Sequence, residues 1–170
     1  LSPRYGLTVT DGLFMSSRDG KRWNRWDEAF MTPGPEHSLN WVYGDCYPAR
    51  GMIETPSPIA GAPNELSLYV FDNHWSGQAS QLRRHALRVD GFVSCRAPYR
   101  PATVVTKPFL FSGRRLSINF ATSAAGYLRV TLVGPRRTLT SCELFGDSLD
   151  RTVVFDSGDP SALAGQPVTM

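Results

Sequence analysis

The sequence is poor in lysine and has no dense run of basic residues. Of 18 basic residues only Lys21 and Lys107 are lysines, and the formal net charge is +3. The arginines are scattered or form short pairs such as Arg83-Arg84. A nucleic-acid-binding surface more often carries a basic stripe with stacking aromatic residues. We therefore expect no nucleic-acid partner and interpret these arginines as solvated surface groups.

Closely spaced cysteines and histidines are also missing, which argues against a metal centre. The three cysteines, Cys46, Cys95 and Cys142, are far apart, and no Cys-x-x-Cys or His-x-x-x-His pair occurs. Structural zinc sites need such pairs. We expect buried or half-buried thiols, with one disulfide as an open alternative. The sequence also has no phosphate loop, dinucleotide fingerprint or nucleophile elbow, so we predict neither metal nor cofactor.

Long apolar segments are absent as well. No run is long enough to cross a bilayer, so the sequence predicts no membrane partner. The chain starts at Leu1 without the basic and apolar regions of a signal peptide, and it ends in a segment that resembles the opening of another strand. We expect both ends to be cuts through a longer polypeptide. Cytoplasmic and secreted locations therefore both stay open.

No window shows a sustained helical period, whereas glycine (15) and proline (13) divide the whole chain into short segments. Segments of this length are typical of strands in a sandwich, barrel or propeller. We expect one short helical turn within Ser157–Leu163. Alternating or β-branched and aromatic segments predict strands at Gly12–Ser17, Arg22–Trp26, Met52–Thr55, Glu65–Phe71, Gln81–Val89, Phe92–Arg96, Val104–Phe111, Arg115–Thr122, Tyr127–Val133 and Arg151–Phe155.

Two Asp-Gly pairs, Asp19-Gly20 and Asp90-Gly91, lie between predicted strands. Asp-Gly supplies the positive φ angles of a tight hairpin turn. A strand, Asp-Gly, strand unit that recurs along the chain suggests propeller blades, and two unrelated hairpins are the alternative. We expect Ser17, Asp19 and Trp23 to be structural, with the indole filling the gap between sheets.

The pattern changes near residue 100, after the connector Ala97–Ala102. Beyond it, Leu116, Ile118 and Phe120 alternate with polar residues, as a sheet with one buried face requires. We therefore predict an all-β protein of two domains. Residues 1–97 would form the end of a β-propeller, and residues 98–170 an antiparallel β-sandwich of jelly-roll or concanavalin-like type.

Several motifs, in their order along the chain, resemble the end of a five-bladed propeller glycosidase. Ser17–Trp23 reads Ser-Arg-Asp-Gly-Lys-Arg-Trp and resembles the Ser-x-Asp-Gly-x-x-Trp hairpin of such blades. Tyr47–Gly51, Glu65–Tyr69 and Leu82–Ser94 are similar to the strands and outer hairpin of a last blade. The segments that resemble the sandwich after the propeller are Val105–Pro108, Phe120–Gly126, Phe145–Ser148 and Ser161–Val168.

This resemblance to invertase-like and arabinanase-like glycoside hydrolases implies a carbohydrate-active parent. The earlier blades, which carry most of the catalytic groups in such enzymes, would precede Leu1, so the resemblance implies no complete catalytic centre in this chain. It also implies that one strand of the sandwich is missing. An open strand edge favours self-association.

Glycoside cleavage needs two carboxyl groups on opposite sides of the bond. The candidates are Asp45, Glu54, Asp72 and Glu65, and we predict Asp45 as the catalytic residue because it lies in an aromatic segment, Asn40–Tyr47. A turn aspartate beside core aromatics is the alternative. Trp41, Tyr43, Arg50, His74 and Trp75 are the predicted substrate-binding residues, since aromatic faces stack on sugars and the polar groups bind hydroxyls.

Two classes of function follow from these expectations. The first is a fragment of a glycosidase-like protein that hydrolyses a glycoside in its full-length form. The second is a non-catalytic module that binds carbohydrate or braces a propeller.

Overall fold

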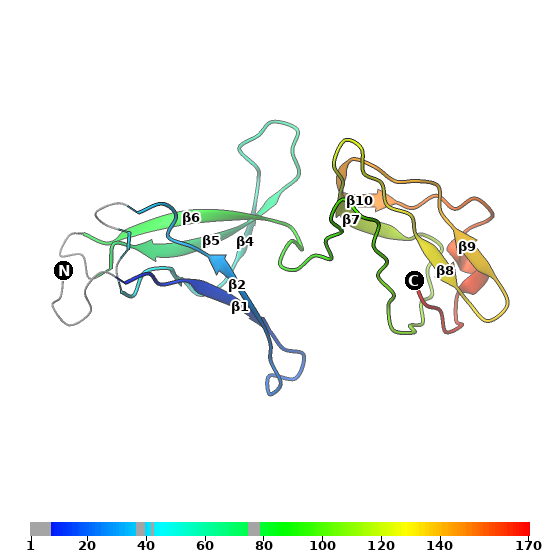
Figure 1. Cartoon of the computed structure of the whole chain (residues 1–170), viewed down its shortest axis with the longest axis horizontal. Helices are drawn as coiled ribbons and strands as arrows, with labels where there is room; N and C mark the ends of the chain where they lie inside the picture. The colour runs from blue at the N-terminus through cyan, green and yellow to red at the C-terminus, as the bar shows by residue number, and fades with distance from the viewer. Residues whose placement is uncertain (1–7, 37–39, 42, 75–78) are drawn as a thin grey trace. The chain divides into compact units, whose positions relative to one another are not determined.

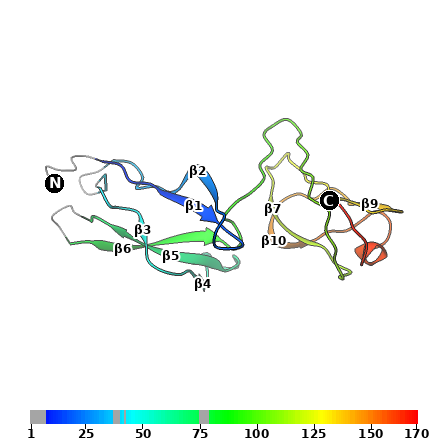
Figure 2. The ribbon, with the colours of Figure 1, turned by 90° about the horizontal axis from the view of Figure 1, so that it is seen from below.

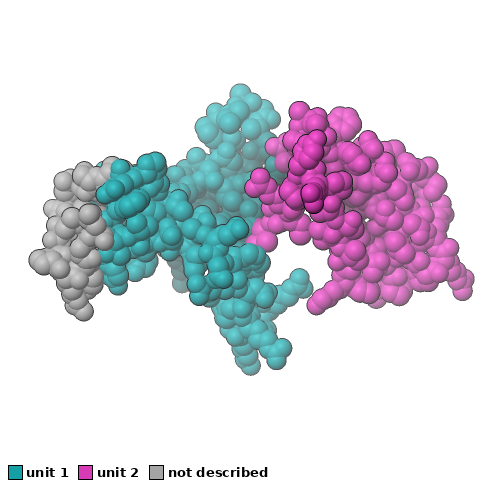
Figure 3. Space-filling model, in the orientation of Figure 1, with its two compact units in different colours: residues 1–92 teal, residues 93–170 magenta. Residues whose placement is uncertain are grey.

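The computed structural model describes residues 8–36, 40–41, 43–74 and 79–170. The chain forms two compact units, Leu1–Phe92 and Val93–Met170, coloured separately in Figure 3. The predicted boundary follows residue 97. The first unit ends at Phe92, whose ring stacks on Phe14 with 5.3 Å between centroids, so the chain stays attached to the first unit up to this residue.

The described residues of the first unit form six short strands. They are β1 (Gly12–Ser16), β2 (Asn24–Met31), β3 (Tyr47–Pro48), β4 (Ile53–Thr55), β5 (Glu65–Asp72) and β6 (Gln81–Arg88). β1 and β2 form an antiparallel hairpin, while β5 pairs antiparallel with β3, β4 and β6 (Figure 1). Because β3 and β4 pair with successive parts of β5, the sheet is a three-row meander whose first row is interrupted at residues 49–52.

Side chains alternate along β5, and this alternation gives its sheet two different faces. Leu68 and Val70 are buried on the core face, at 8% and 0% exposure. The β1–β2 hairpin lies over this face in Figure 2, and Met31 packs there with Cys46. A second apolar contact comes from aromatic rings, with Phe14 lying 5.2 Å from Trp26 and 5.5 Å from Phe30. The first unit is therefore two sheets packed face to face.

The connection from β1 to β2 differs from the predicted two-residue turn. It spans residues 17–23, because the Asp19 carboxylate accepts hydrogen bonds from the backbone N–H groups of Lys21 and Arg22, both at 2.8 Å. These hydrogen bonds also lower the pKa of Asp19. Trp23 is 55% exposed, so the prediction that its indole fills the gap between sheets is wrong, and Trp26 packs on Phe14 instead.

The second unit contains β7 (Ser117–Ala121), β8 (Thr131–Val133), β9 (Thr138–Thr140) and β10 (Asp147–Thr152). β7 pairs with β10, and β8 pairs with β9, all antiparallel. Isolated bridges join Phe109 to Val168 and Val133 to Thr169. The core is formed by Val130, Leu132, Leu139, Leu144, Val153, Phe155, Leu163 and Val168.

The predicted all-β class is confirmed in the described parts of the chain, which form neither an α-helix nor a closed barrel. The short helical turn is confirmed as a 3-10 helix, η1 (Pro160–Leu163), whose N-terminus is capped by Asp159. No described helix is long and apolar enough to span a membrane.

Five predicted strands differ from the structure by more than two residues at an end. Arg22–Trp26 ends too early, since β2 runs from Asn24 to Met31, and Tyr127–Val133 starts too early, since β8 begins at Thr131. Phe92–Arg96 is not a strand, because the chain leaves β6 through a turn with Asp90 at φ 57° and does not return along it. Val104–Phe111 is not a continuous strand and makes isolated backbone pairs with the end of the chain, such as Phe109 with Val168. Arg151–Phe155 is shifted, since β10 ends at Thr152. The structure also contains β9, which was not predicted because its three residues are too few to show a period.

Gly134 begins the turn between β8 and β9. Because it has no side chain, the core residue Leu163 can pack closely against this turn. A Cβ there would lie 2.5 Å from Cδ2 of Leu163, which is buried at 1% exposure and has little room to move. We predict that Gly134→Ala lowers the free energy of unfolding by about 1–3 kcal/mol, measured by chemical denaturation.

Gly113→Ala is the matched control, because its Cβ would meet nothing closer than Arg115 O at 3.8 Å. It should change stability by no more than about 0.5 kcal/mol. Equal stability of the two variants would contradict the packing argument.

Candidate functional site

Asp45 lies in the segment that leads from the β1–β2 hairpin into β3, and the residue is 1% exposed. One oxygen, Oδ1, accepts a hydrogen bond from the backbone N–H of His74 at 2.8 Å. The other, Oδ2, accepts from the backbone N–H of Asn73 at 3.2 Å. Asp45 therefore ties the start of β3 to the chain that leaves β5.

The backbone around this carboxylate adopts left-handed conformations. φ is 89° at Gly44, 62° at Cys46 and 62° at Asn73. Such angles are unfavourable for Cys and tolerated by Asn, so tertiary contacts must hold them. The hydrogen bonds of Asp45 to Asn73 and His74 are contacts of this kind. The turn and the carboxylate thus stabilise each other.

A second carboxylate, Asp72, lies at the end of β5 and is 7% exposed. Its Oδ2 is 2.8 Å from Nε of Arg83 on β6, although this oxygen has no well-aligned hydrogen bond among the described residues. Strand register explains the pairing. Asp72 is opposite Gln81, so Arg83, two residues further, lies on the same core face.

Burial and neighbouring charge both act on the acid–base properties of this cluster. Burial raises the pKa of Asp45, its two backbone hydrogen bonds oppose this increase, and the charge of Asp72 adds to it. Burial, followed by the charges of Asp72 and Asp45, also raises the pKa of the Cys46 thiol to about 11. Cys46 is therefore a protonated, unreactive thiol at neutral pH.

The predicted substrate-binding residues are in different environments. Trp41 is half-buried, and its indole Nε1 donates to Gly34 O at 3.1 Å. Tyr43 is 42% exposed, Arg50 is exposed and His74 is half-buried. His74 is brought to Asp45 through its backbone N–H. Trp75 lies outside the described residues.

The four candidate carboxylates each have partners in the first unit. Asp45 accepts from backbone groups and Asp72 pairs with Arg83. Glu65 forms an ion pair with Arg84 at 3.0 Å, and the exposed Glu54 accepts from Asn64 at 2.8 Å. A proton-transferring role for Asp45 stays a prediction, and the geometry gives Asp45 a positioning role. Within the described ranges no group of three His, Cys, Asp or Glu residues could hold a metal ion.

The structure also shows a surface that the sequence did not suggest. Tyr47, Phe71 and Leu82 lie directly opposite one another on β3, β5 and β6, so they share the face of the sheet opposite the core face. We call this the outer face. Their exposed fractions are 55%, 42% and 56%, which is high for three large apolar side chains in one row.

A polar network lies further along the outer face. Arg84 donates from Nε to Ser67 Oγ at 2.6 Å and from Nη2 to Thr55 Oγ1 at 3.0 Å, and it pairs with Glu65. Ser67 is fully buried beneath this arginine. The interpretation of Arg83 and Arg84 as solvated surface groups missed their two ion pairs, which the strand register of β5 with β6 could have indicated.

The cysteines follow the expectation only in part. Cys46 is buried, but Cys95 and Cys142 are exposed, and all three are free. The thiol of Cys142 donates to Asp156 Oδ1 at 3.2 Å, and this hydrogen bond raises its pKa. The disulfide alternative is not realised.

Comparison of the chain with protein-family models, with curated proteins and with solved structures finds no match.

The raised pKa of Asp45 makes its contribution to stability depend on pH. The folded chain keeps the proton in a pH range above 3.8, where the unfolded chain has already lost it. The contribution of Asp45 to the free energy of unfolding is therefore greatest below pH 3.8 and decreases as the pH rises through the folded pKa. We predict that Asp45→Asn costs about 1–2 kcal/mol at low pH and less at neutral pH, measured by denaturation at both.

Asp27→Asn is the control, because the Asp27 side chain is 90% exposed. Its effect should stay within about 0.5 kcal/mol at either pH. A cost of Asp45→Asn that grows toward neutral pH would contradict the argument.

Proposed function

We propose that the chain is the terminal part of a β-propeller, followed by a β-sandwich, in a glycosidase-like carbohydrate-active protein. In this proposal the first unit contributes sugar-binding and positioning groups, and the reacting carboxyl groups belong to other blades. The proposal depends on the exposed apolar row of the outer face. This row indicates that the sheet of β3, β4, β5 and β6 is covered on both faces in the complete protein.

The topology of the first unit supports this architecture. A propeller blade is an antiparallel meander, and β3 with β4, then β5, then β6 form one in sequence order. Neighbouring blades pack face to face, as the β1–β2 hairpin packs on the core face. In this arrangement the hairpin is the outer part of one blade and β3–β6 belong to the next.

The outer face supports the same architecture from the other side. An antiparallel sheet at a protein surface usually has one apolar and one polar face. The β5 sheet instead has Leu68 and Val70 on the core face and Phe71 on the outer face, together with its neighbours Tyr47 and Leu82. We infer that a further sheet covers the outer face in the complete protein.

The state of Asp45 supports a binding role over a catalytic one for this unit. Both of its oxygens already accept backbone hydrogen bonds, and the carboxylate is almost fully buried. Its function in this proposal is to hold the segment that carries Tyr43. The exposed Tyr43 ring can then stack on the apolar face of a sugar.

The second unit suits the role of the sandwich. Its core is lined from both pairs of strands, Leu132 on β8 and Leu139 on β9 facing the half-buried Ile118 and Phe120 on β7. A wholly non-catalytic binding module is a second candidate, favoured by the hydrogen-bonded state of Asp45. Glycoside hydrolysis by a longer form of the protein would distinguish the two candidates.

Retardation of the purified chain in native gels that contain arabinan or a β-fructan tests the sugar-binding role. We predict measurable retardation in at least one of these gels. Tyr43→Ala should weaken binding by about 0.5–1.5 kcal/mol, the order of one aromatic contact.

Tyr99→Ala is the matched control, because Tyr99 is fully exposed in the second unit. No retardation by any of these polymers, or equal effects of Tyr43→Ala and Tyr99→Ala, would count against the proposal.

The outer face generates a separate prediction about association. A chain with Tyr47, Phe71 and Leu82 exposed in one row should self-associate at high concentration, and Leu82→Ser should reduce the association. Leu110→Ser is the control, since Leu110 is 68% exposed but lies in the second unit. Sedimentation velocity over a concentration series measures the effect, and a monomeric wild-type chain at every concentration would contradict it.

A further inference from the structure

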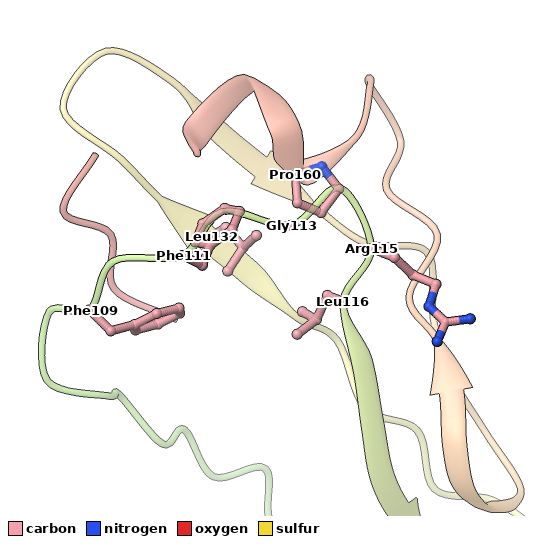
Figure 4. Close-up of a pocket in the computed structure, with 7 residues that line it drawn as sticks. All are labelled: Phe109, Phe111, Gly113, Arg115, Leu116, Leu132 and Pro160. Atoms are coloured by element: carbon pink, nitrogen blue, oxygen red, sulfur yellow. The ribbon is translucent and has the colours of Figure 1, made fainter. Parts of the chain in front are cut away.

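The second unit contains an apolar pocket that the proposed function does not use. Its volume is about 220 Å³, and Figure 4 shows the residues around it, which are Phe109, Phe111, Gly113, Arg115, Leu116, Leu132 and Pro160. Leu132, at 2% exposure, belongs to the core, so the pocket reaches from the surface to the core.

Backbone pairing explains why the pocket lies at this position. Phe109 exchanges backbone hydrogen bonds with Val168, and Phe111 O accepts from Gly165 N at 2.9 Å. Leu116 O accepts instead from Val153 N at 2.8 Å, directly next to the strand pair of β7 and β10. The chain therefore changes partners across residues 112–115, and the two sets of partners leave a gap between Phe111 and Leu116.

The size and lining of the pocket indicate that it accommodates an apolar group about as large as one phenyl ring. Most of its wall is formed by phenylalanine, leucine and proline side chains, which offer a ligand no hydrogen bonds, and Gly113 and Arg115 complete the lining. A cavity of about 150 Å³ with a similar lining, engineered in another protein, stays dry and binds benzene. A pocket of 220 Å³ has room for a phenyl ring and the start of a short linker.

The rim of the pocket carries positive charge. The Arg115 side chain is 65% exposed, and its only described ion pair is a long one, 4.0 Å from the exposed Asp150. In Figure 4 the Arg115 side chain starts at the rim and its guanidinium points away from the apolar lining, Phe109, Phe111, Leu116 and Leu132. The carboxylate of Asp159 lies next to Pro160, and its pKa is lowered first by its hydrogen bonds from Ser161 and then by the charges of Arg114 and Arg137. The exposed Arg115 side chain can turn toward an anionic group at the rim, because its ion pair with Asp150 is long.

We propose that this pocket binds an aromatic carboxylate, with the ring between Phe111, Leu116 and Leu132 and the carboxylate outside, against Arg115. The inference does not depend on the proposed function, because the pocket lies within the second unit and involves none of the sugar-binding residues. Binding requires no covalent or redox step.

Titration of the whole chain with 3-phenylpropanoate, followed by NMR shift perturbation, tests the proposal. The expected result is saturable binding with shifts at Phe111 and Leu132. The neutral analogue 3-phenylpropan-1-ol should bind about threefold more weakly, since a single solvent-exposed charge interaction has this size. Equal binding of the acid and the alcohol would overturn the role of Arg115.

Two pairs of variants separate the ring site from the charge. Leu116→Phe should fill the pocket and weaken 3-phenylpropanoate at least about tenfold, as displacement of a buried ring requires. Leu110→Phe, at an exposed position beyond the pocket, should bind like wild type. Arg115→Gln should weaken the acid but leave the alcohol unchanged, and Arg136→Gln, at another exposed arginine, should weaken neither.

Each outcome decides the proposal. Absence of saturable binding by the wild-type chain overturns it, and so does wild-type affinity in Leu116→Phe. An unchanged free energy of unfolding for Leu116→Phe and Arg115→Gln would show that any loss of binding in these variants is local.

Discussion

β5 forms backbone hydrogen bonds with β3, β4 and β6, and the rest of the first unit depends on this one strand. Because its side chains alternate, its register determines which residues become core and which become surface. The side chains of Leu68 and Val70 point to the β1–β2 hairpin. Asp72 lies on the same face and pairs with Arg83. Ser67 and Phe71 point the other way, to the Arg84 network and the exposed row. A shift of one residue would bury the charged network and expose the core, so the register is strongly specified.

The hydrogen bonds that hold the buried carboxylate of Asp45 depend on the same strand. Its two hydrogen-bond donors, Asn73 and His74, follow β5 directly, and the left-handed conformation of Asn73 aims both N–H groups at one side chain. The charge of Asp72 is close by and makes ionisation of Asp45 less favourable, while the backbone donors make it more favourable. Burial is the largest of these effects, so the geometry favours a protonated carboxyl over a wider pH range than an exposed aspartate has. Such a group can stabilise a loop without taking part in chemistry.

The strands with a long alternating pattern were predictable, and the interactions that close the site were not. Glu65–Asp72 and Gln81–Arg88 have enough residues to show period two, and both were expected within one residue of their ends. β3 and β9 have two and three residues, too few for a period, and their existence depends on partners elsewhere in the chain. Asp45 was predicted as a site residue from its aromatic neighbours, yet its burial depends on Asn73 and His74, far along the sequence. Local propensity contains no information about such a contact. Trp23 shows the same limit. A resemblance to a hairpin motif does not indicate whether the indole of Trp23 or that of Trp26 packs on Phe14.

The two units differ in where their apolar surface is left uncovered, and this difference separates the two proposals. In the first unit the uncovered surface is a flat row on three paired strands, Tyr47, Phe71 and Leu82. A flat row suits another flat surface, and a second sheet covers such a row better than a small molecule does. In the second unit the uncovered surface is a hollow between Phe111 and Leu116, produced where the chain changes from one set of partners to another. A hollow with a buried floor encloses a small ring and leaves no room for a sheet. Shape therefore assigns the flat surface to assembly and the hollow to a ligand.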